Sequence, residues 1–287
     1  MSNVITLDDP KYPALLKSIK NPPKQLFYEG RWREDLFKNT LAVVGSRNMT
    51  NYGKDLATKI VTALTSMGVV VVSGFMYGID AVAHLAAINA GLSTVAVLPC
   101  GVNIIHPSKN RELYFELKRS QLLISEYPDN FAPKNWTYVK RNRIIAGLSQ
   151  AVAVIEAAKE SGSLLTAEFA IKENRKVFAL PGNVGSTNSE GTLNLILNKK
   201  AEILLSSTQI CDFFGIVSNP KAKSTQYDNN TGSRDGLQLL ELLRREPMYA
   251  DEISQKLNIA AKTLNFYLTT LLLEGLLKEE NGKFYAN

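Results

Sequence analysis

The chain has 287 residues, 45% of them hydrophobic, and carries a formal net charge of +6. This length suits one large domain with a small one, and the apolar content supports a substantial core. No apolar run approaches the roughly 20 residues that span a bilayer, and residues 1–10 lack the apolar region of a secretory signal, so we expect a cytoplasmic protein without membrane contact.

The positive charge belongs to the larger, N-terminal part of the chain. Residues 235–287 contain six Lys or Arg and eight Asp or Glu, which leaves a net charge of +8 on the remainder. If the protein binds a polyanion, the large domain should therefore carry the binding surface.

Cysteine and histidine are too few and too scattered to predict a metal site. Cys100 and Cys211 match no metal or disulfide framework, and neither His84 nor His106 has a partner at metal-ligand spacing. We expect neither a metal nor another cofactor.

Residues 1–40 predict a short helix near 12–16, a proline turn at 21–23 and a small strand at 26–30. This segment is too short for a domain, so we expect an N-terminal extension packed on the edge of the main domain.

From residue 41 to residue 217, apolar strands alternate with helical segments. The strands are expected at 41–44, 69–72, 94–98, 122–124, 151–155 and 177–180, and the helices at 52–67, 79–90, 110–119, 143–148 and 163–173. These repeats predict an α/β fold, a doubly wound parallel sheet with right-handed crossovers. A ligand would then lie beyond the carboxyl ends of the strands.

The turn after the first of these strands, Gly45-Ser46-Arg47, predicts an anion site. Thr50 or Asn51 can cap the following helix, whose N-terminal amides attract negative charge. Arg47 adds a guanidinium suited to bidentate phosphate contact. The alternative is an ordinary strand–helix turn with a surface arginine.

A second turn begins at Ser73, where Gly74 and Gly78 bracket a bent loop. Asp80 and His84 stand four residues apart in the next helix and so share one face. We expect an Asp80–His84 pair that fixes the loop. An acid–base dyad is the less favoured alternative.

A third stretch combines cations with aromatic residues. The cations lie within the run Lys140, Arg141, Asn142 and Arg143, which is expected to precede a helix, and Trp136 and Tyr138 lie just upstream. Charges for phosphates beside π-faces for bases suit a single-stranded nucleic acid. The alternative is a solvated charge run with Trp136 in a core.

A fourth stretch places hydroxyl groups and a glycine at another helix N-terminus. It contains Ser161, Gly162, Ser163 and Thr166. This is again an anion-binding arrangement, although simple N-capping by Ser161 or Ser163 would satisfy the same pattern.

Common nucleotide and hydrolase motifs are absent from the sequence. No G-x-G-x-x-G follows the first strand of the alternating region, and no P-loop, H-E-x-x-H or G-x-S-x-G occurs. The second strand of that region ends in Ser73-Gly74 instead of an acid that could hold a ribose.

Five motifs, in order and spacing, resemble the DNA-processing protein A family (DprA, also called Smf) from about residue 12 to residue 205. They are V-G-S-R at 44–47, S-G-x3-G-I-D-x3-H at 73–84, R-N-R-I-I-A-G-L-S at 141–149, E-A-x3-S-G-S-L-x-T-A at 156–167 and P-G at 181–182. The resemblance implies an extended Rossmann fold that binds single-stranded DNA. It also implies a homodimer that protects incoming DNA in natural transformation and loads the RecA recombinase, without being an enzyme.

By the same resemblance, Arg47, Lys140, Arg141 and Arg143 would form a phosphate pocket. The remaining DNA-binding positions are Gly45, Ser46, Asn142, Ser161, Gly162, Ser163 and Thr166. The chain departs from the family pattern in Phe75-Met76-Tyr77, in His106 before Pro107, in Tyr138-Val139 and in Leu193. These departures bear on groove shape and base preference, not on the phosphate pocket.

Beyond residue 217 the composition changes. Residues 218–235 form a polar linker, and 236–287 predict three helices, at 237–245, 250–257 and 262–274, followed by a hairpin with Asn281-Gly282 at its turn. This pattern is typical of a winged helix. Lys262 is the only base of its recognition helix, so we expect protein contact or a weak auxiliary role.

A second class of function stays open. The protein could be a nucleotide-processing enzyme, similar to phosphoribohydrolases of the lysine-decarboxylase-like Rossmann group, that uses Glu156 or Glu168 near a phosphate. The P-G-G-x-G-T signature of that group does not occur here.

Overall fold

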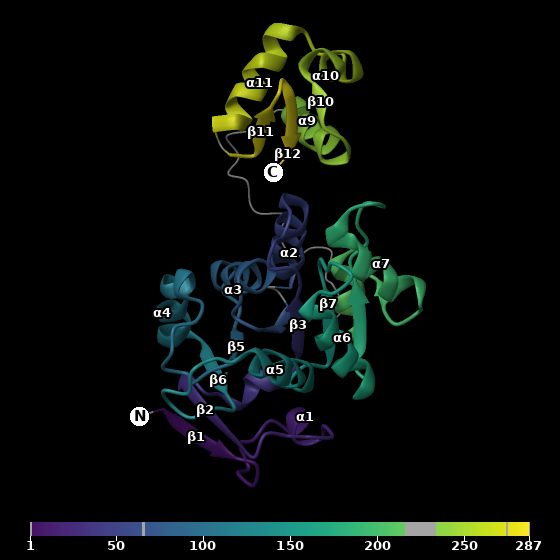
Figure 1. Ribbon diagram of the computed structural model, residues 1–287. Helices are drawn as coiled ribbons and strands as arrows, with labels where there is room; N and C mark the ends of the chain where they lie inside the picture. The colour runs from purple at the N-terminus through teal and green to yellow at the C-terminus, as the bar shows by residue number, and fades with distance from the viewer. Residues whose placement is uncertain (1, 65–66, 216–233, 274, 287) are drawn as a thin grey trace. The chain divides into compact units, whose positions relative to one another are not determined.

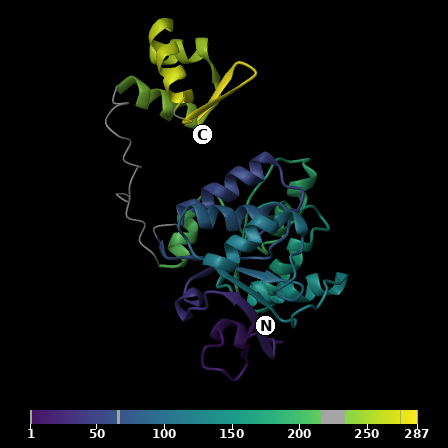
Figure 2. The same ribbon diagram turned by 90° about the vertical axis from the view of Figure 1, so that its left-hand side faces the viewer.

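The computed structural model describes residues 2–64, 67–215, 234–273 and 275–286. The chain divides into two compact units, Met1–Asn219 and Pro220–Asn287, each with its own core. Figure 1 labels the helices and strands of both units, and Figure 2 shows them from the side. Most of the expected linker, 218–235, lies outside the described residues.

The first unit is built on a nine-stranded sheet with the order β1-β2-β6-β5-β4-β3-β7-β8-β9. The central strands run parallel, as predicted. They are β3 (Thr40–Val44), β4 (Val70–Ser73), β5 (Thr94–Leu98), β6 (Leu122–Ser125), β7 (Ala151–Val154) and β8 (Lys176–Ala179). The predicted α/β fold with a doubly wound parallel sheet is confirmed.

Alternating side chains along each central strand bury both faces of the sheet. In β3, Leu41 and Val43 join one core cluster, while Ala42 and Val44 join the other. The first face is covered by α2 (Asn51–Ala63) and α3 (Ile79–Asn89), and the second by α5 (Asn135–Gly147) and α6 (Gly162–Lys172). Strands buried on both faces read as continuous apolar runs, which is why the sequence revealed them.

The strand order reverses between β3 and β7. From β3 the chain proceeds through α2 and α3 to β4, β5 and β6, and α5 then brings it back to β7 on the other side of β3. The turn after β3 leads to α2 on one face, whereas the loop after β7 leads to α6 on the opposite face. Such a divergence opens a crevice at the carboxyl ends of the two strands.

The N-terminal extension lengthens the sheet instead of only packing against it. β2 (Gln25–Gly30) pairs antiparallel with β6, and β1 (Asn3–Thr6) pairs with β2, so both strands lie at one edge (Figures 1 and 2). The short helix α1 (Ala14–Lys17) packs on α5 through the buried Leu16. A 3₁₀ turn at Glu34–Phe37 leads into β3.

Several elements of the first unit were not predicted from the sequence. They are β1, α7 (Glu190–Leu197), β9 (Glu202–Ile203) and α8 (Ser207–Phe213), while α4 (Arg111–Ser120) was predicted. A larger correction concerns α5, which begins at Asn135 and not near residue 143. The basic run therefore lies inside a helix, so its members point to different faces.

The second unit has the winged-helix arrangement expected from the sequence. Its helices are α9 (Arg234–Arg245), α10 (Ala250–Leu257) and α11 (Ala261–Leu273), and β10 (Met248–Tyr249) joins the hairpin of β11 (Leu277–Glu280) and β12 (Lys283–Ala286). The turn residues Asn281 and Gly282 both have positive φ, as a tight hairpin turn requires. Lys262 is the only base on α11.

A candidate anion-binding pocket at the switch point of the sheet

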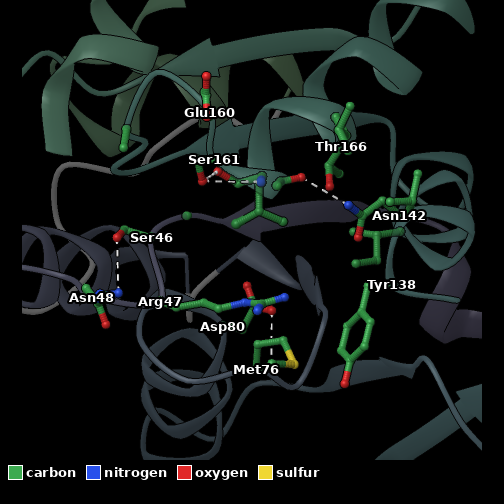
Figure 3. Close-up of a pocket in the computed structure, with 18 of the residues that line it drawn as sticks. Ser46, Arg47, Asn48, Met76, Asp80, Tyr138, Asn142, Glu160, Ser161 and Thr166 are labelled. Carbon is green, nitrogen blue, oxygen red and sulfur yellow. Dashed lines mark hydrogen bonds between the residues drawn. The ribbon is translucent and has the colours of Figure 1, made fainter. Parts of the chain in front are cut away.

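A pocket of about 770 Å³ occupies the crevice where the strand order reverses. The turn after β3, the loop before α6 and the N-terminal half of α5 line it. Figure 3 shows Ser46 and Arg47 on one side and Ser161 and Thr166 on the other. Parallel strands thus bring together two predicted turns that lie more than one hundred residues apart in sequence.

Arg47 is the exposed cation of this pocket. Its guanidinium carbon lies 5.4 Å from the centroid of the Tyr138 ring, an arrangement that supports a cation–π contact. Arg47 therefore presents its charge from a supported position rather than as a free surface side chain.

The turn that carries Arg47 is rigid. The Ser46 carbonyl accepts a hydrogen bond from the Ile79 amide at 3.2 Å, and the Ser46 hydroxyl accepts one from the Asn48 amide at 3.1 Å. Gly78 has φ +73°, and a Cβ there would lie 2.2 Å from the Ser46 carbonyl oxygen. The loop after β4 therefore needs glycine at this position, because the Arg47 turn packs directly against it.

The N-terminus of α6 forms the opposite wall. Ser161 caps the helix by accepting from the Ser163 amide, and no atom lies within 4 Å of the place that a Cβ on Gly162 would take. Thr166 also lines the pocket, although only 1% of its surface is exposed. Asn142 donates to the Gly162 carbonyl at 3.0 Å and ties α5 to this wall. An anion in the pocket would meet the positive end of the α6 dipole.

Arg141 and Asp80 lie buried at the base of the pocket, and this corrects the expectation that Arg141 is free for phosphate. Arg141 is 3% exposed, and its guanidinium donates to the carbonyl oxygens of Gly74 and Val97. Burial raises the pKa of Asp80, while the nearby Arg141 guanidinium and the hydrogen bond from the Met76 amide act in the opposite direction. Because the Arg141 guanidinium donates to carbonyl oxygens inside the fold, including that of Gly74, it holds the loop after β4 in place.

Gly74 is required by this buried pair. A Cβ at Gly74 would lie 2.5 Å from both an Arg141 guanidinium nitrogen and an Asp80 carboxylate oxygen. The predicted bent loop between Gly74 and Gly78 is confirmed, with Phe75 at φ +64°.

The predicted Asp80–His84 pair is wrong. His84 Nδ1 lies 2.7 Å from the Thr94 hydroxyl, and that hydroxyl donates its only hydrogen to the Val71 carbonyl. Nδ1 must therefore carry the proton, which leaves Nε2 buried without a hydrogen-bond partner. Burial and the Arg141 charge lower the pKa of His84 from 6.5 to about 3. This neutral side chain serves the fold and does not suit acid–base chemistry.

Lys140 and Arg143 lie on α5 outside the pocket lining. Arg143 forms a 2.5 Å ion pair with Glu126 and is 11% exposed, whereas Lys140 lies 3.5 Å from the same carboxylate and is 47% exposed. Lys140 can therefore reach a ligand by leaving a weak surface pair. Arg143 cannot do so without taking the close partner away from a nearly buried carboxylate.

The two carboxylates of the enzyme alternative do not line the pocket. Glu156 is buried and accepts hydrogen bonds from the Thr50 amide at 2.9 Å and the Thr50 hydroxyl at 2.5 Å. Thr50 in turn caps α2 by accepting from the Gly53 amide, so Glu156 stabilises a helix start. Glu168 is exposed on α6.

The sequence analysis missed several residues that line the pocket, among them Asn135, Glu160, Thr187 and Asn188. Asn188 donates to the Asn48 carbonyl at 2.9 Å, and its own carbonyl accepts from the Ala157 amide at 2.8 Å. It therefore joins the turn after β3 to the loop after β7. Asn188 follows β8, the sixth parallel strand, and this position after the carboxyl end of a strand could have marked it in the sequence as a candidate pocket residue.

Within the described ranges, no three His, Cys, Asp or Glu side chains are arranged to hold a metal ion. Among the same residues, every helix is too short or too polar to cross a lipid bilayer. The chemistry of the pocket is thus that of one exposed guanidinium, hydroxyl and amide groups, a helix N-terminus and the exposed carboxylate of Glu160.

A doubly wound α/β domain with such a pocket at its switch point defines a Rossmann-like protein suited to phosphate-bearing ligands. The family model of DNA recombination-mediator protein A matches residues 3–215, and the chain belongs to this family. The resemblance inferred from the five motifs is confirmed.

Proteins from several bacteria share the first unit. Protein Smf from Synechocystis is 41% identical over 216 residues, which is 74% of this chain and 54% of that protein. DNA processing protein DprA from Bacillus subtilis is 37% identical over 194 residues, 68% of this chain and 65% of the relative. The match thus covers 54% of the length of the first relative and 65% of the length of the second.

Two solved structures share the fold. The X-ray structure of DprA from Streptococcus pneumoniae superposes with a TM-score of 0.70 and 37% identity, covering 74% of each chain. DNA processing protein A from Helicobacter pylori, whose structure is described in terms of a single-stranded DNA binding mode, superposes with a TM-score of 0.66 and 28% identity, covering 75% of this chain and 98% of that one.

Proposed function

We propose that this protein is a non-enzymatic, single-stranded DNA-binding recombination mediator. In this role it protects single strands that enter the cell in DNA uptake and natural transformation, and it loads the RecA recombinase onto them. The observation that carries the proposal is the pocket at the switch point, where Arg47 faces the N-terminus of α6.

The pocket offers groups that can contact both the phosphates and the bases of a DNA strand. Arg47 offers a planar fork of donors, and the α6 N-terminus adds amide groups and a positive dipole end. Tyr138 adds a π-face beside Arg47. Phosphate contacts combined with an aromatic surface favour an unpaired strand, because a duplex keeps its bases stacked inside.

The net charge supports the same assignment. The first unit holds the positive excess of the chain, whereas residues 235–287 are net negative. We assign the single-strand site to the first unit and a protein-contact or auxiliary role to the winged helix. The division into 1–40, 41–217, 218–235 and 236–287 belongs to this proposal.

The RecA contact and the homodimer rest on family membership. The Helicobacter pylori relative is described as binding single-stranded DNA, and the Bacillus relative is named a DNA processing protein. Both observations support a role in DNA handling. A cytoplasmic location follows from such a role.

A binding titration across a range of salt concentrations tests the function. Labelled single strands should bind with an affinity that falls as salt rises, and unlabelled single strands should displace them far better than duplex of the same sequence. Equal displacement by duplex would contradict the proposal. Hydrolysis of nucleoside monophosphates would favour the enzyme alternative, for which the engaged Glu156 gives no support.

A further inference from the structure

The exposed tryptophan of α5 lies beside the pocket and not in a core. Trp136 stands in the first turn of α5 and is 50% exposed, although an indole ring is among the most costly side chains to leave in water. The alternative, in which Trp136 packs in a core, is therefore wrong. An exposed large aromatic surface next to a candidate site points to a ligand.

Helix geometry places this ring next to the pocket lining. Asn135, Tyr138, Val139 and Asn142 line the pocket from one face of α5. Trp136 and Lys140 are four residues apart and share the neighbouring face. A DNA strand that extends from the pocket across α5 would therefore contact Trp136 next.

The ring is held in place from behind. Tyr127 and Phe131 stack at 4.6 Å with an interplanar angle of 14°, and Trp136 meets their rings edge-on at 5.8 and 6.3 Å. Because these contacts restrict the side chain before any ligand arrives, little conformational entropy would be lost on binding.

Two cations flank the aromatic surface. Lys140 Nζ lies 6.0 Å from the Trp136 ring centroid, and Lys134 Nζ lies 5.5 Å from that of Phe131. Both lysines are exposed. A half-exposed indole with one ammonium group beside it and another beside the adjoining Phe131 ring matches a nucleobase with its neighbouring phosphates better than it matches an apolar protein segment.

We propose that Trp136, with Lys134 and Lys140, forms a base-stacking subsite for single-stranded DNA that continues the pocket across α5. The proposal rests on the proposed function. It adds that the strand contacts more of the protein than the pocket encloses, and that Trp136 stacks on a base just outside it. Stacking requires no particular base, so the subsite contributes affinity without sequence preference.

Intrinsic fluorescence reports on this subsite directly. The chain has two tryptophans, and the other, Trp32, packs between Tyr28 and Phe37 with its buried N–H unpartnered. Trp32→Phe therefore leaves no polar group unsatisfied and makes Trp136 the sole reporter. Saturation with oligothymidylate should quench this fluorescence, whereas unchanged emission at saturation would overturn the proposal.

The length of the oligonucleotide distinguishes binding at the subsite from binding in the pocket. With oligothymidylates of about three to about twelve nucleotides, Trp136→Ala should weaken binding of the longer strands by roughly 5- to 150-fold, the range expected for one stacked base. Strands too short to leave the pocket should bind the variant and the parent equally, and Trp136→Tyr should restore most of the affinity for long strands.

Phe115 provides a matched control. It is 48% exposed, and the guanidinium carbon of Arg111 lies 5.0 Å from its ring, but it stands on α4 outside the pocket lining. Phe115→Ala should leave DNA affinity unchanged. If long strands bind Trp136→Ala as tightly as the parent while Arg47→Ala weakens them, the subsite is wrong and the function stands. If the parent binds no single strand, both fail.

Discussion

The guanidinium carbon of Arg47 lies 5.4 Å from the centroid of the Tyr138 ring in the pocket, although the turn after β3 and α5 supply them from positions 91 residues apart. The contact supports the guanidinium to which we assign phosphate binding. Tyr138 is held in turn by His106, whose Nε2 lies 2.6 Å from the tyrosine hydroxyl. Two departures from the family pattern, His106 and Tyr138, therefore support each other.

Arg47→Ala should weaken single-strand binding and reduce the dependence of log affinity on log salt by about 0.7, the loss of one phosphate contact. The free energy of unfolding should change little, because the side chain is exposed. Titrations at several salt concentrations measure the slope, and Arg111→Ala serves as an exposed arginine away from the pocket. An unchanged slope would remove Arg47 from the site.

Lys140 and Arg143 should behave differently despite standing three residues apart. Lys140→Ala should lower affinity with a similar loss of salt dependence, because its ammonium is half exposed. Arg143→Ala should leave the affinity of the folded protein unchanged and lower the free energy of unfolding by about 1–3 kcal/mol, since it leaves Glu126 without its close partner. Urea unfolding and binding titrations on both variants make the comparison. Weaker binding by a stable Arg143→Ala would refute this division.

Arg141→Leu should destabilise the protein by about 3–5 kcal/mol, because it leaves the buried Asp80 carboxylate without its cation. Adding Asp80→Asn should recover part of the loss, which a double-mutant cycle from urea unfolding would measure. Full stability combined with weaker DNA binding would instead make Arg141 a direct contact.

Acid should destabilise the fold partly through His84. Its pKa is about 3 in the folded protein and 6.5 ordinarily, so the unfolded chain binds a proton that the folded protein excludes. The contribution of His84 to the free energy of unfolding is complete above pH 6.5 and is lost as pH falls toward 3. The loss amounts to about 1.4 kcal/mol per pH unit.

His84→Asn should remove this part of the pH dependence, since an amide can still donate to Thr94. Urea unfolding of both proteins between about pH 7 and pH 5 isolates the His84 contribution from that of the carboxylates. In a proton NMR titration of the folded protein, one of the two histidines should show no titration near neutral pH. Parallel stability curves for parent and variant would contradict the assignment.

Truncation after Ser218 should leave a folded first unit with most of the single-strand affinity. The described pocket residues all precede this point, and the chain divides into its two units at Asn219. The comparison is with residues 236–287 alone at one salt concentration. A C-terminal fragment that binds well, beside an N-terminal one that does not, would move the site to the winged helix.

Local patterns in the sequence were sufficient for the order of the six central strands and for one wall of the site. Apolar runs marked the six central strands, and Thr50, one of the two residues predicted as the cap, caps α2. Strand β9 has two residues, and α8 has seven. Such short elements carry too few residues for a period to stand out, so they escaped prediction.

The sequence by itself determined that Arg47 and the Ser161–Gly162–Ser163 turn would meet at the carboxyl ends of parallel strands, because strand direction follows from the repeated strand–helix pattern. Only the tertiary structure decided among the three cations of α5. Successive helical residues point about 100° apart, so a shift of the helix start changes which side chain faces the pocket, the sheet or the solvent. Packing on the sheet set that rotation. It buried Arg141 against Gly74, paired Arg143 with Glu126 and left Lys140 exposed beside Trp136.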